Sequence, residues 1–390
     1  MQKKIILLSA YINYIFQGMG ALILSLTLSD LKTIWNASTF QVSVVIGGIG
    51  LGRLLFMYIS GIISDKLGRK FAILLSSAMY CVFFGVVGFC SNYLLAFACT
   101  LIAGFCHALY DTSIYPLITE LYPNEKLQSS LSILNKAFIS FGQFILPIIV
   151  IQFAAMHLAF QAVYLFCVIC ILFNFILFAF LPVTKEISVV QQQEKNRQRG
   201  RLDLPSCLLL VFSFVSVSIF TIFTTWVATY GKDILQMTKA QSSLCVSLYS
   251  VCSIVSVFTT AFVVRLGVKR MTIILFDMLM SFIGLLLLNI YPTQIVLYIT
   301  TVIIGLFAAG GIWQLGLVEL LERTNGAKGR YTSYYSLAAS LALFLIPSFT
   351  GYFADRNLQS VFWIDSLLVA IGLISLIVFK HYQKSDSCKS

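Results

Sequence analysis

Long apolar runs, separated by short polar or charged segments, follow one another along the whole sequence. A run of about 18 or more apolar residues is long enough for an α-helix to cross a hydrocarbon core about 30 Å thick. Breaks in hydropathy and charge predict twelve such spans, at residues 5–29, 40–62, 71–90, 93–118, 128–154, 158–182, 205–230, 238–263, 271–290, 294–318, 332–354 and 359–379. The pattern therefore predicts an all-α integral membrane protein with 12 transmembrane helices.

The composition agrees with a membrane location. The 390 residues are 59% hydrophobic and 11% charged, whereas a soluble chain of this length has roughly 25% charged residues. The first apolar run follows "MQKK", contains Asn13 and Gln17, and has no small-residue cleavage site. We therefore expect a retained helix rather than a signal peptide, and no soluble domain of any size.

Basic residues are distributed unequally between the segments that connect the spans. With a cytoplasmic N-terminus, the inner segments hold 20 of the 26 basic residues, the outer segments hold four, and Arg53 and Lys136 lie within spans. Positive residues concentrate on the cytoplasmic side of membrane proteins. The sequence therefore predicts a multi-pass cell-membrane protein with both termini in the cytoplasm. This bias explains the net charge of +11 without a nucleic-acid partner.

The longest connection, "PVTKEISVVQQQEKNRQRGRLDLP", divides the chain into two sets of six spans. Because it is polar, Gln-rich and basic, we expect a flexible cytoplasmic linker, or one that is partly helical along the inner surface. The predicted organisation is an N-terminal six-helix bundle at 1–182, a linker at 183–204, a C-terminal six-helix bundle at 205–380 and a cytoplasmic tail at 381–390.

The two halves show weak similarity at an offset near 200 residues. "SDKLGRK" at 64–70 aligns with "VVRLGVK" at 263–269, and Glu120 and Glu319 each close a fourth span. Three residues of the fifth span recur in the eleventh, and the pairs are Ser140 and Ser340, Phe144 and Phe344, and Pro147 and Pro347. Duplication of a six-helix unit is typical of secondary transporters.

The segment "GIISDKLGRK", Gly61 to Lys70, resembles the loop 2–3 signature of the major facilitator superfamily, G-x-x-x-D-x-x-G-R-K/R. It lies between the second and third spans, where the family has it, and a decayed copy with Val264 in place of Asp65 follows the eighth span. The resemblance covers the whole chain. It implies two pseudo-symmetric six-helix bundles that transport a substrate by alternating access to a site between them.

Two glycines of this motif have a physical interpretation. Gly61 allows close helix approach, as small residues do in membrane interfaces, and Gly68 permits a tight turn at the inner surface.

The resemblance also implies a gating role for the charged residues near the inner surface. Asp65 would contact the second half when the inner side is closed. Arg69, followed by Lys70, would pair with Glu120, and Lys269 or Arg270 would pair with Glu319. The alternative is that these charges only set the topology.

Three charged residues lie near the predicted membrane midplane in the first half. Asp111 lies about 9 residues, or roughly 14 Å, from the inner end of its span, and Arg53 and Lys136 lie at similar depth. Charged residues are rare there unless they face a partner or a water-filled cavity. One interpretation is a structural Arg53–Asp111 ion pair, with Lys136 extending to the inner face. The other is that Arg53 and Lys136 bind an anionic substrate, while Asp111 competes for them and carries a proton.

Other polar residues complete the predicted site. His107 lies one turn before Asp111 on the same helix face, where it would relay a proton or form a helix–helix hydrogen bond. Asp277 and Asp365 are the only acids well inside the C-terminal spans and are candidates for a second proton site. Seven further residues are expected to line the substrate cavity: Asn13, Gln17, Tyr110, Tyr115, Gln143, Trp313 and Gln314.

The predicted function is secondary active transport, most simply proton-coupled uptake (symport) of a small organic anion. The three residues Arg53, Asp111 and Lys136 carry one net positive charge, which suits an anion. In addition, "DTSIYP…E" resembles the organic-acid-type bacterial members of the family, and this resemblance implies a monocarboxylate or a hydroxy acid of the shikimate or quinate kind. The expected partners are this substrate, the proton and the lipid bilayer, and the family implies a monomer. No nucleotide-binding, metal-binding or nucleophile motif is present, so we predict neither a cofactor, nor a metal, nor an enzyme.

Two alternatives remain open at this stage. The first is an efflux carrier for drugs or metabolites, with Asp111 as the counter-charge of a cation. However, "SFGQFILPIIV" stands where drug/proton antiporters have G-P-x-x-G-G, and the fourth span lacks their arginine. The second is a non-transporting membrane sensor, although such proteins usually carry a large soluble domain.

Overall fold

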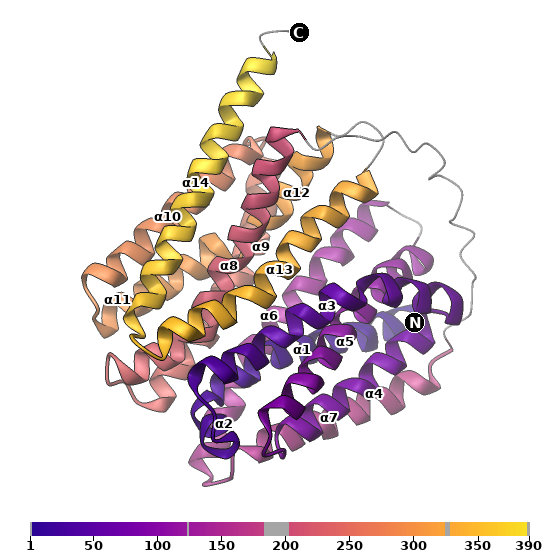
Figure 1. The fold of residues 1–390 in the computed structure, drawn as a ribbon. Coiled ribbons are helices and arrows are strands. Elements are labelled where there is room, and N and C mark those ends of the chain that lie inside the picture. The colour runs from indigo at the N-terminus through magenta and orange to yellow at the C-terminus, as the bar shows by residue number, and fades with distance from the viewer. Residues whose placement is uncertain (1, 123–124, 183–202, 324–327, 388–390) are drawn as a thin grey trace. The chain divides into compact units, whose positions relative to one another are not determined.

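The computed structural model describes residues 2–122, 125–182, 203–323 and 328–387, and every regular element within them is a helix (Figure 1). In chain order the helices are α1 (Gln2–Leu26), α2 (Leu28–Trp35), α3 (Thr39–Leu67), α4 (Arg69–Val87), α5 (Tyr93–Leu121), α6 (Glu125–Ala155), α7 (Gln161–Phe180), α8 (Leu204–Asp233), α9 (Lys239–Arg265), α10 (Arg270–Ile290), α11 (Gln294–Ile303), the π-helix η1 (Ile304–Ala308), α12 (Ile312–Glu322), α13 (Lys328–Ala354) and α14 (Gln359–Ser387).

Twelve segments of the described chain are helical, long and apolar enough to cross a membrane. The prediction of an all-α membrane protein with 12 transmembrane helices is therefore confirmed. One short helix was not predicted. This is α2, which lies in the connection between the first two spans, where its last residue, Trp35, donates a hydrogen bond from Nε1 to the Cys90 carbonyl at 2.9 Å.

The helices belong to two compact units. The first unit contains α1–α7 together with Pro347–Asp355 at the end of α13. The second contains α8–α12, α13 up to Ile346, and α14. The predicted linker, 183–204, lies almost entirely outside the described residues.

In the first unit, α3 and α5 approach each other closely because glycines face the neighbouring backbone. A Cβ atom at Gly52 would lie 2.1 Å from the Leu101 carbonyl oxygen, and one at Gly104 would lie 2.2 Å from that of Ile49. Small residues allow this kind of contact between membrane helices. The close packing places Arg53 of α3 next to α5.

The same N-terminal motif begins the second span of each half. Ser38 caps α3 and forms a capping box with Gln41, and Thr238 caps α9 and forms a capping box with Gln241. In a capping box the first side chain accepts a hydrogen bond from the backbone N–H three residues later, and the side chain of that later residue accepts one from the backbone N–H of the first. The two boxes are 200 residues apart, like the fifth-span matches with the eleventh. The two capping boxes are therefore a structural similarity between the halves, in addition to the sequence similarity.

The tenth span is interrupted, which the sequence analysis did not predict. It consists of α11, the π-helix η1 and α12, with Gly311 at φ +118° before α12 begins. A Cβ atom at Gly310 would lie 1.5 Å from Ser256 Oγ of α9. The π-helix and the two glycines thus bring this span against α9. Segments of π-helix within α-helices are frequent at functional sites.

Candidate functional site

An ion pair between α3 and α5 occupies the interior of the first unit. Arg53 Nη2 lies 3.0 Å from Asp111 Oδ2, and the two side chains are 25% and 18% exposed. The glycine-mediated contact of α3 with α5 brings them together. The pair is thus largely but not completely buried.

Two further helices contribute polar atoms to this ion pair. The Tyr14 hydroxyl of α1 donates a hydrogen bond to Asp111 Oδ1 at 3.3 Å, and Asn135 Nδ2 of α6 donates one to the Tyr14 hydroxyl at 3.4 Å. Among the described residues, Arg53 Nε has no hydrogen-bond partner. A guanidinium has five N–H donors, so Arg53 retains donors after it binds Asp111. We refer to Tyr14, Arg53, Asp111 and Asn135 as the Arg53 cluster.

Two residues expected to line the cavity lie instead in a packed polar network. Asn13 and Tyr110 are both fully buried. Asn13 Oδ1 accepts hydrogen bonds from Ser77 Oγ at 2.9 Å, Asn174 Nδ2 at 3.2 Å and the Tyr110 hydroxyl at 3.4 Å. This network joins α1, α4, α5 and α7. In this conformation, Asn13 and Tyr110 hold helices together and are not accessible to a substrate.

His107 packs between α4 and α5. It is 6% exposed, and its ring stacks on Tyr80 with a centroid distance of 5.9 Å and an interplanar angle of 6°. In the described part of the chain, neither His107 Nε2 nor the Tyr80 hydroxyl has a hydrogen-bond partner. The ring stacking joins α5 to α4, but within the described residues Nε2 does not make the helix–helix hydrogen bond that was one of the two expectations.

The remaining predicted residues of the first unit differ in exposure. Lys136 follows Asn135 on α6 and is half-buried, as is Gln143 on the same helix. Gln17 of α1 is only 5% exposed, whereas Tyr115 of α5 is 43% exposed.

In the second unit, Trp313 and Gln314 lie at the start of α12. Trp313 Nε1 donates a hydrogen bond to Ser213 Oγ at 2.9 Å, and the Trp313 carbonyl accepts one from the Tyr335 hydroxyl at 3.0 Å. These bonds attach α12 to α8 and α13. Trp313 is half-buried, and the neighbouring Gln314 side chain is exposed.

The Gly61–Lys70 motif forms a compact charge cluster at the α3–α4 turn. Arg69 lies 2.6 Å from Asp65 Oδ1 and 3.1 Å from Glu120 Oε1, and it also donates a hydrogen bond to Ser64 Oγ at 2.7 Å. The next residue, Lys70, donates from Nζ to the Leu181 carbonyl at 2.7 Å. The Arg69–Glu120 pair is the one that the motif predicts, and Asp65 pairs with Arg69 of its own half.

The two motif glycines behave differently. Gly68 has φ +93° between α3 and α4, so it supplies the predicted tight turn. A Cβ atom at Gly61 would have no heavy atom of the described residues within 4 Å. The expectation that Gly61 allows close helix approach is therefore wrong in this structure.

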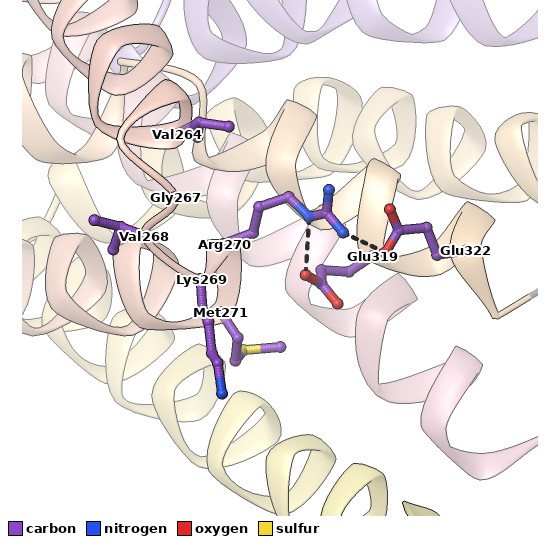
Figure 2. A pocket seen from close by; sticks show the side chains of 8 residues that line it. All are labelled: Val264, Gly267, Val268, Lys269, Arg270, Met271, Glu319 and Glu322. Atoms are coloured by element: carbon purple, nitrogen blue, oxygen red, sulfur yellow. Dashed lines mark hydrogen bonds and ion pairs between the residues drawn. The ribbon is translucent and has the colours of Figure 1, made fainter.

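The second unit has a corresponding cluster at the turn between α9 and α10. Arg270 Nε lies 3.1 Å from Glu319 Oε1, and Arg270 Nη2 also pairs with Glu322. Figure 2 shows Arg270 between the two glutamates, while Lys269 extends away from them. Of the two basic residues considered for Glu319, the structure selects Arg270. The surrounding cavity has a volume of about 310 Å³, and its lining includes Gly267, whose φ is +85°.

Some residues of these clusters were not identified from the sequence. Asn135 precedes Lys136, and two adjacent polar residues inside an apolar span could have identified Asn135 as a site residue from the sequence. Glu322 lies one turn after Glu319, so Arg270 reaches both from one side of α12.

Asp355, just beyond α13, accepts hydrogen bonds from the backbone N–H groups of Thr39 and Phe40, each at 2.9 Å. No local pattern indicates this last contact, because its partners are more than 300 positions apart in the chain.

Comparisons with known proteins agree with the fold and the motif. The model of the Major Facilitator Superfamily matches residues 10–324 and 234–388. The chain is 32% identical to the inner membrane transport protein YdiM of Escherichia coli, over 94% of this chain and 91% of the relative. It is 31% identical to the uncharacterized MFS-type transporter YfkL of Bacillus subtilis, over 96% of both chains.

Solved structures show the same fold at low identity. The D-xylose-proton symporter superposes with a TM-score of 0.78 at 16% identity, covering 96% of both chains. The nucleoside transporter NupG superposes with a TM-score of 0.77 at 12% identity, covering 97% of this chain and 98% of that one. Together with the family match across the chain, these findings show that the protein is a multi-pass membrane transporter belonging to the Major Facilitator Superfamily.

Proposed function

We propose that this transporter takes up a small organic anion together with a proton, and that Arg53 binds the anionic group of the substrate. The observation that carries the proposal is the partly accessible Arg53–Asp111 pair, in which Arg53 Nε is unused among the described residues. Arginine presents donors in a fork that matches a carboxylate, so it can bind a second anion beside Asp111 or in its place.

The Arg53 cluster also suggests how binding is coupled to a proton. When a substrate carboxylate displaces Asp111 from Arg53, Asp111 loses its cation in a desolvated site, and such a site favours the neutral form of a carboxyl group. Asp111 then takes up a proton, and Tyr14 and Asn135 keep its side chain in place. When the substrate leaves, Asp111 releases the proton and pairs with Arg53 again. Lys136, one residue after Asn135, would add positive charge.

The rest of the site follows from the same proposal. Gln17, Tyr115 and Gln143 of the first unit would contact the less charged part of the substrate, and Trp313 and Gln314 of the second unit are proposed substrate contacts as well. Their amides, hydroxyl and indole suit a substrate that carries hydroxyl groups as well as a carboxylate. Asn13 and Tyr110 would support these helices from behind, and His107 would stabilise the packing of α4 against α5.

We further propose that the two bundles, 1–182 and 205–380, change conformation as units. The Arg69–Glu120 and Arg270–Glu319 pairs would stabilise the ends of the bundles at the cytoplasmic face, and Asp65 would pair with the second bundle when that face closes. The concentration of basic residues in the connections supports cytoplasmic termini in a bacterial inner membrane. The protein would act as a monomer.

Ligand-induced stabilisation of the purified protein tests the anion proposal. The panel contains shikimate, quinate, lactate and benzoate, neutral sugars, and lipophilic cations. A ligand that binds only the folded state raises the melting temperature in proportion to its occupancy. We expect a carboxylate to stabilise the wild type, and we expect this effect to be lost in Arg53→Gln.

A matched control removes an arginine elsewhere. Arg265→Gln removes the same charge from an exposed position at the end of α9, and it should keep the full response to the carboxylate. Stabilisation by cations alone, retained in Arg53→Gln, would contradict the proposal and favour efflux. Stabilisation by a sugar alone would contradict it as well.

A further inference from the structure

Asp277 of the second unit is a buried carboxylate whose surroundings are unlike those of Asp111. Asp277, in the middle of α10, is 7% exposed. Within the described residues its carboxylate has no hydrogen bond and no ion pair, and only its backbone carbonyl accepts a bond, from Ser281 Oγ at 2.7 Å. An ionisable group inside a membrane span is costly and usually faces a partner or a cavity.

Asp277 lines a cavity of about 460 Å³ between α9, α10 and η1. Ligand pockets in proteins have volumes of about 300–1,000 Å³. The apolar part of the lining comprises Val263, Val268, Ile273, Phe276, Leu306 and Phe307, and the hydroxyl-bearing part comprises Ser256, Thr259, Thr260 and Thr272. Asp277 is the only charged residue in this lining, so nothing within the cavity wall neutralises it.

The interruption of the tenth span helps to shape this cavity. Leu306 and Phe307 belong to the π-helix, and Ser256 Oγ of α9 donates a hydrogen bond to the Leu306 carbonyl. A regular α-helix would place these two side chains in a different register. Phe276, opposite them on α10, packs edge-to-face on Phe307 at a centroid distance of 5.7 Å. The cavity therefore has an aromatic wall beside its single carboxylate.

The rim of the cavity is accessible from the surface of the second unit. Thr259, Val268, Thr272 and Phe276 are all exposed, and Phe258 and Phe262 on the same part of α9 are 54% and 62% exposed. These positions lie on membrane-spanning helices or at their ends. A molecule dissolved in the bilayer can reach such a rim without crossing the packed interior of the unit.

We propose that this cavity binds a lipophilic organic cation with one positive charge, and that Asp277 is its counter-charge. The apolar walls would contact the body of the ligand, and the aromatic rings would add cation–π attraction. The site lies in the second unit and shares no residue with the Arg53 cluster, so the inference goes beyond the proposed anion uptake. It assigns the transporter a second ligand class.

A pair of probes with the same shape and opposite charge tests the proposal. Tetraphenylphosphonium and tetraphenylborate are measured by equilibrium dialysis against the full-length protein in lipid nanodiscs, with empty nanodiscs as the partition control. We expect saturable binding of tetraphenylphosphonium and none of tetraphenylborate. Asp277→Asn should weaken cation binding at least tenfold, whereas Asp233→Asn, which changes an exposed acid at the end of α8, should leave it unchanged.

Two further variants identify where the cation binds. Phe307→Leu keeps the carboxylate but removes an aromatic ring from the cavity wall, so it should weaken binding even though Asp277 remains. Asp111→Asn should retain binding. If the wild type shows no saturable binding, or if Asp277→Asn binds as tightly as the wild type, the proposal is wrong. If binding is lost only in Asp111→Asn, the cation binds in the first unit, and both this proposal and the anion proposal are overturned.

Discussion

Asp111 in the first unit and Asp277 in the second are both buried carboxylates within membrane spans, but their surroundings differ. Asp111 is 3.0 Å from Arg53 and accepts a hydrogen bond from Tyr14. Asp277 has no polar side-chain partner among the described residues and lines an otherwise uncharged cavity. The first carboxylate is thus stabilised by the protein, and the second is stabilised only when a proton or an external cation arrives. The difference shows that the role of an acidic residue in a membrane span depends on its neighbours. Its depth in the membrane does not indicate that role.

The strongest test of this comparison makes Asp111 resemble Asp277. Arg53→Gln leaves the Asp111 carboxylate buried without its cation, and breaking a buried pair in this way costs about 3–5 kcal/mol. We expect a large loss of folding stability and no substrate response. The double variant Arg53→Gln with Asp111→Asn should recover much of the stability, because no charge is then left unpaired. The measurement is the unfolding midpoint of both variants, and equal losses in the single and double variants would contradict the interpretation.

The two arginine clusters provide a second comparison between the units. Arg69 pairs with Asp65 and Glu120 and also donates to Ser64, and its side chain is only 10% exposed, whereas the Arg270 side chain is 29% exposed. Hydrogen bonds between charged groups contribute about 1.5–3 kcal/mol when they are shielded from water, and exposed pairs contribute about 0–1 kcal/mol.

We therefore expect Arg69→Gln to destabilise the protein by about 2 kcal/mol and Arg270→Gln by about half as much. Unfolding of the two variants in parallel measures the difference. A larger effect for Arg270→Gln would show that exposure does not determine the strength of these pairs.

The third test substitutes the two carboxylates and expects opposite changes in folding stability. Asp277→Asn removes a carboxylate that no described residue neutralises, so it should leave stability unchanged or raise it by about 1 kcal/mol. Asp111→Asn removes the partner of Arg53 and should lower stability. Melting temperatures of the two variants, measured without ligand, decide whether the contrast is real. A clear loss of stability in Asp277→Asn would mean that the carboxylate has a structural partner.

The sequence predicted the helices, but not the direction in which the side chains on them point. Span positions follow from hydropathy, and the Arg69–Glu120 pair follows from the motif. Whether Asn13 faces a cavity or a neighbouring helix depends on helix rotation, and within an apolar segment the sequence carries little information about rotation. Asn13 and Tyr110 were assigned to the cavity for this reason, although their polar atoms are fully used in the packed network.

The break in the tenth span was missed for a different reason. Hydropathy is the same for a π-helix and an α-helix, so the apolar run at 294–318 gave no signal of the change. Gly310 and Gly311 were the only local indication, and paired glycines are also common in uninterrupted membrane helices. The cavity at Asp277 depends on this break, which is why the sequence indicated the residue but not its site.

The smallest expected effect concerns the N-termini of α3 and α9, which begin with matching capping boxes. Of these two helices, α3 alone has a carboxylate on its first backbone N–H groups within the described residues, that of Asp355, which is grouped with the first unit. Partial burial acts to raise the pKa of Asp355, but hydrogen bonds from Thr39 and Phe40 and the charge of Lys32 outweigh it and hold the pKa below its usual value.

Because the folded-state pKa of Asp355 is depressed, its contribution to stability is fully present above the unfolded pKa of about 3.9, and it is lost as pH falls through the folded pKa. Asp355→Asn should therefore lower stability by about 0.5–1 kcal/mol at pH 7, the usual scale for a helix cap. The difference from the wild type should shrink as the pH falls below about 4. Thermal unfolding of both proteins across this range measures it, with Asp233→Asn as a control at an exposed acid that caps no described helix. A difference that stays constant with pH would mean that the negative charge of Asp355 does not stabilise the start of α3.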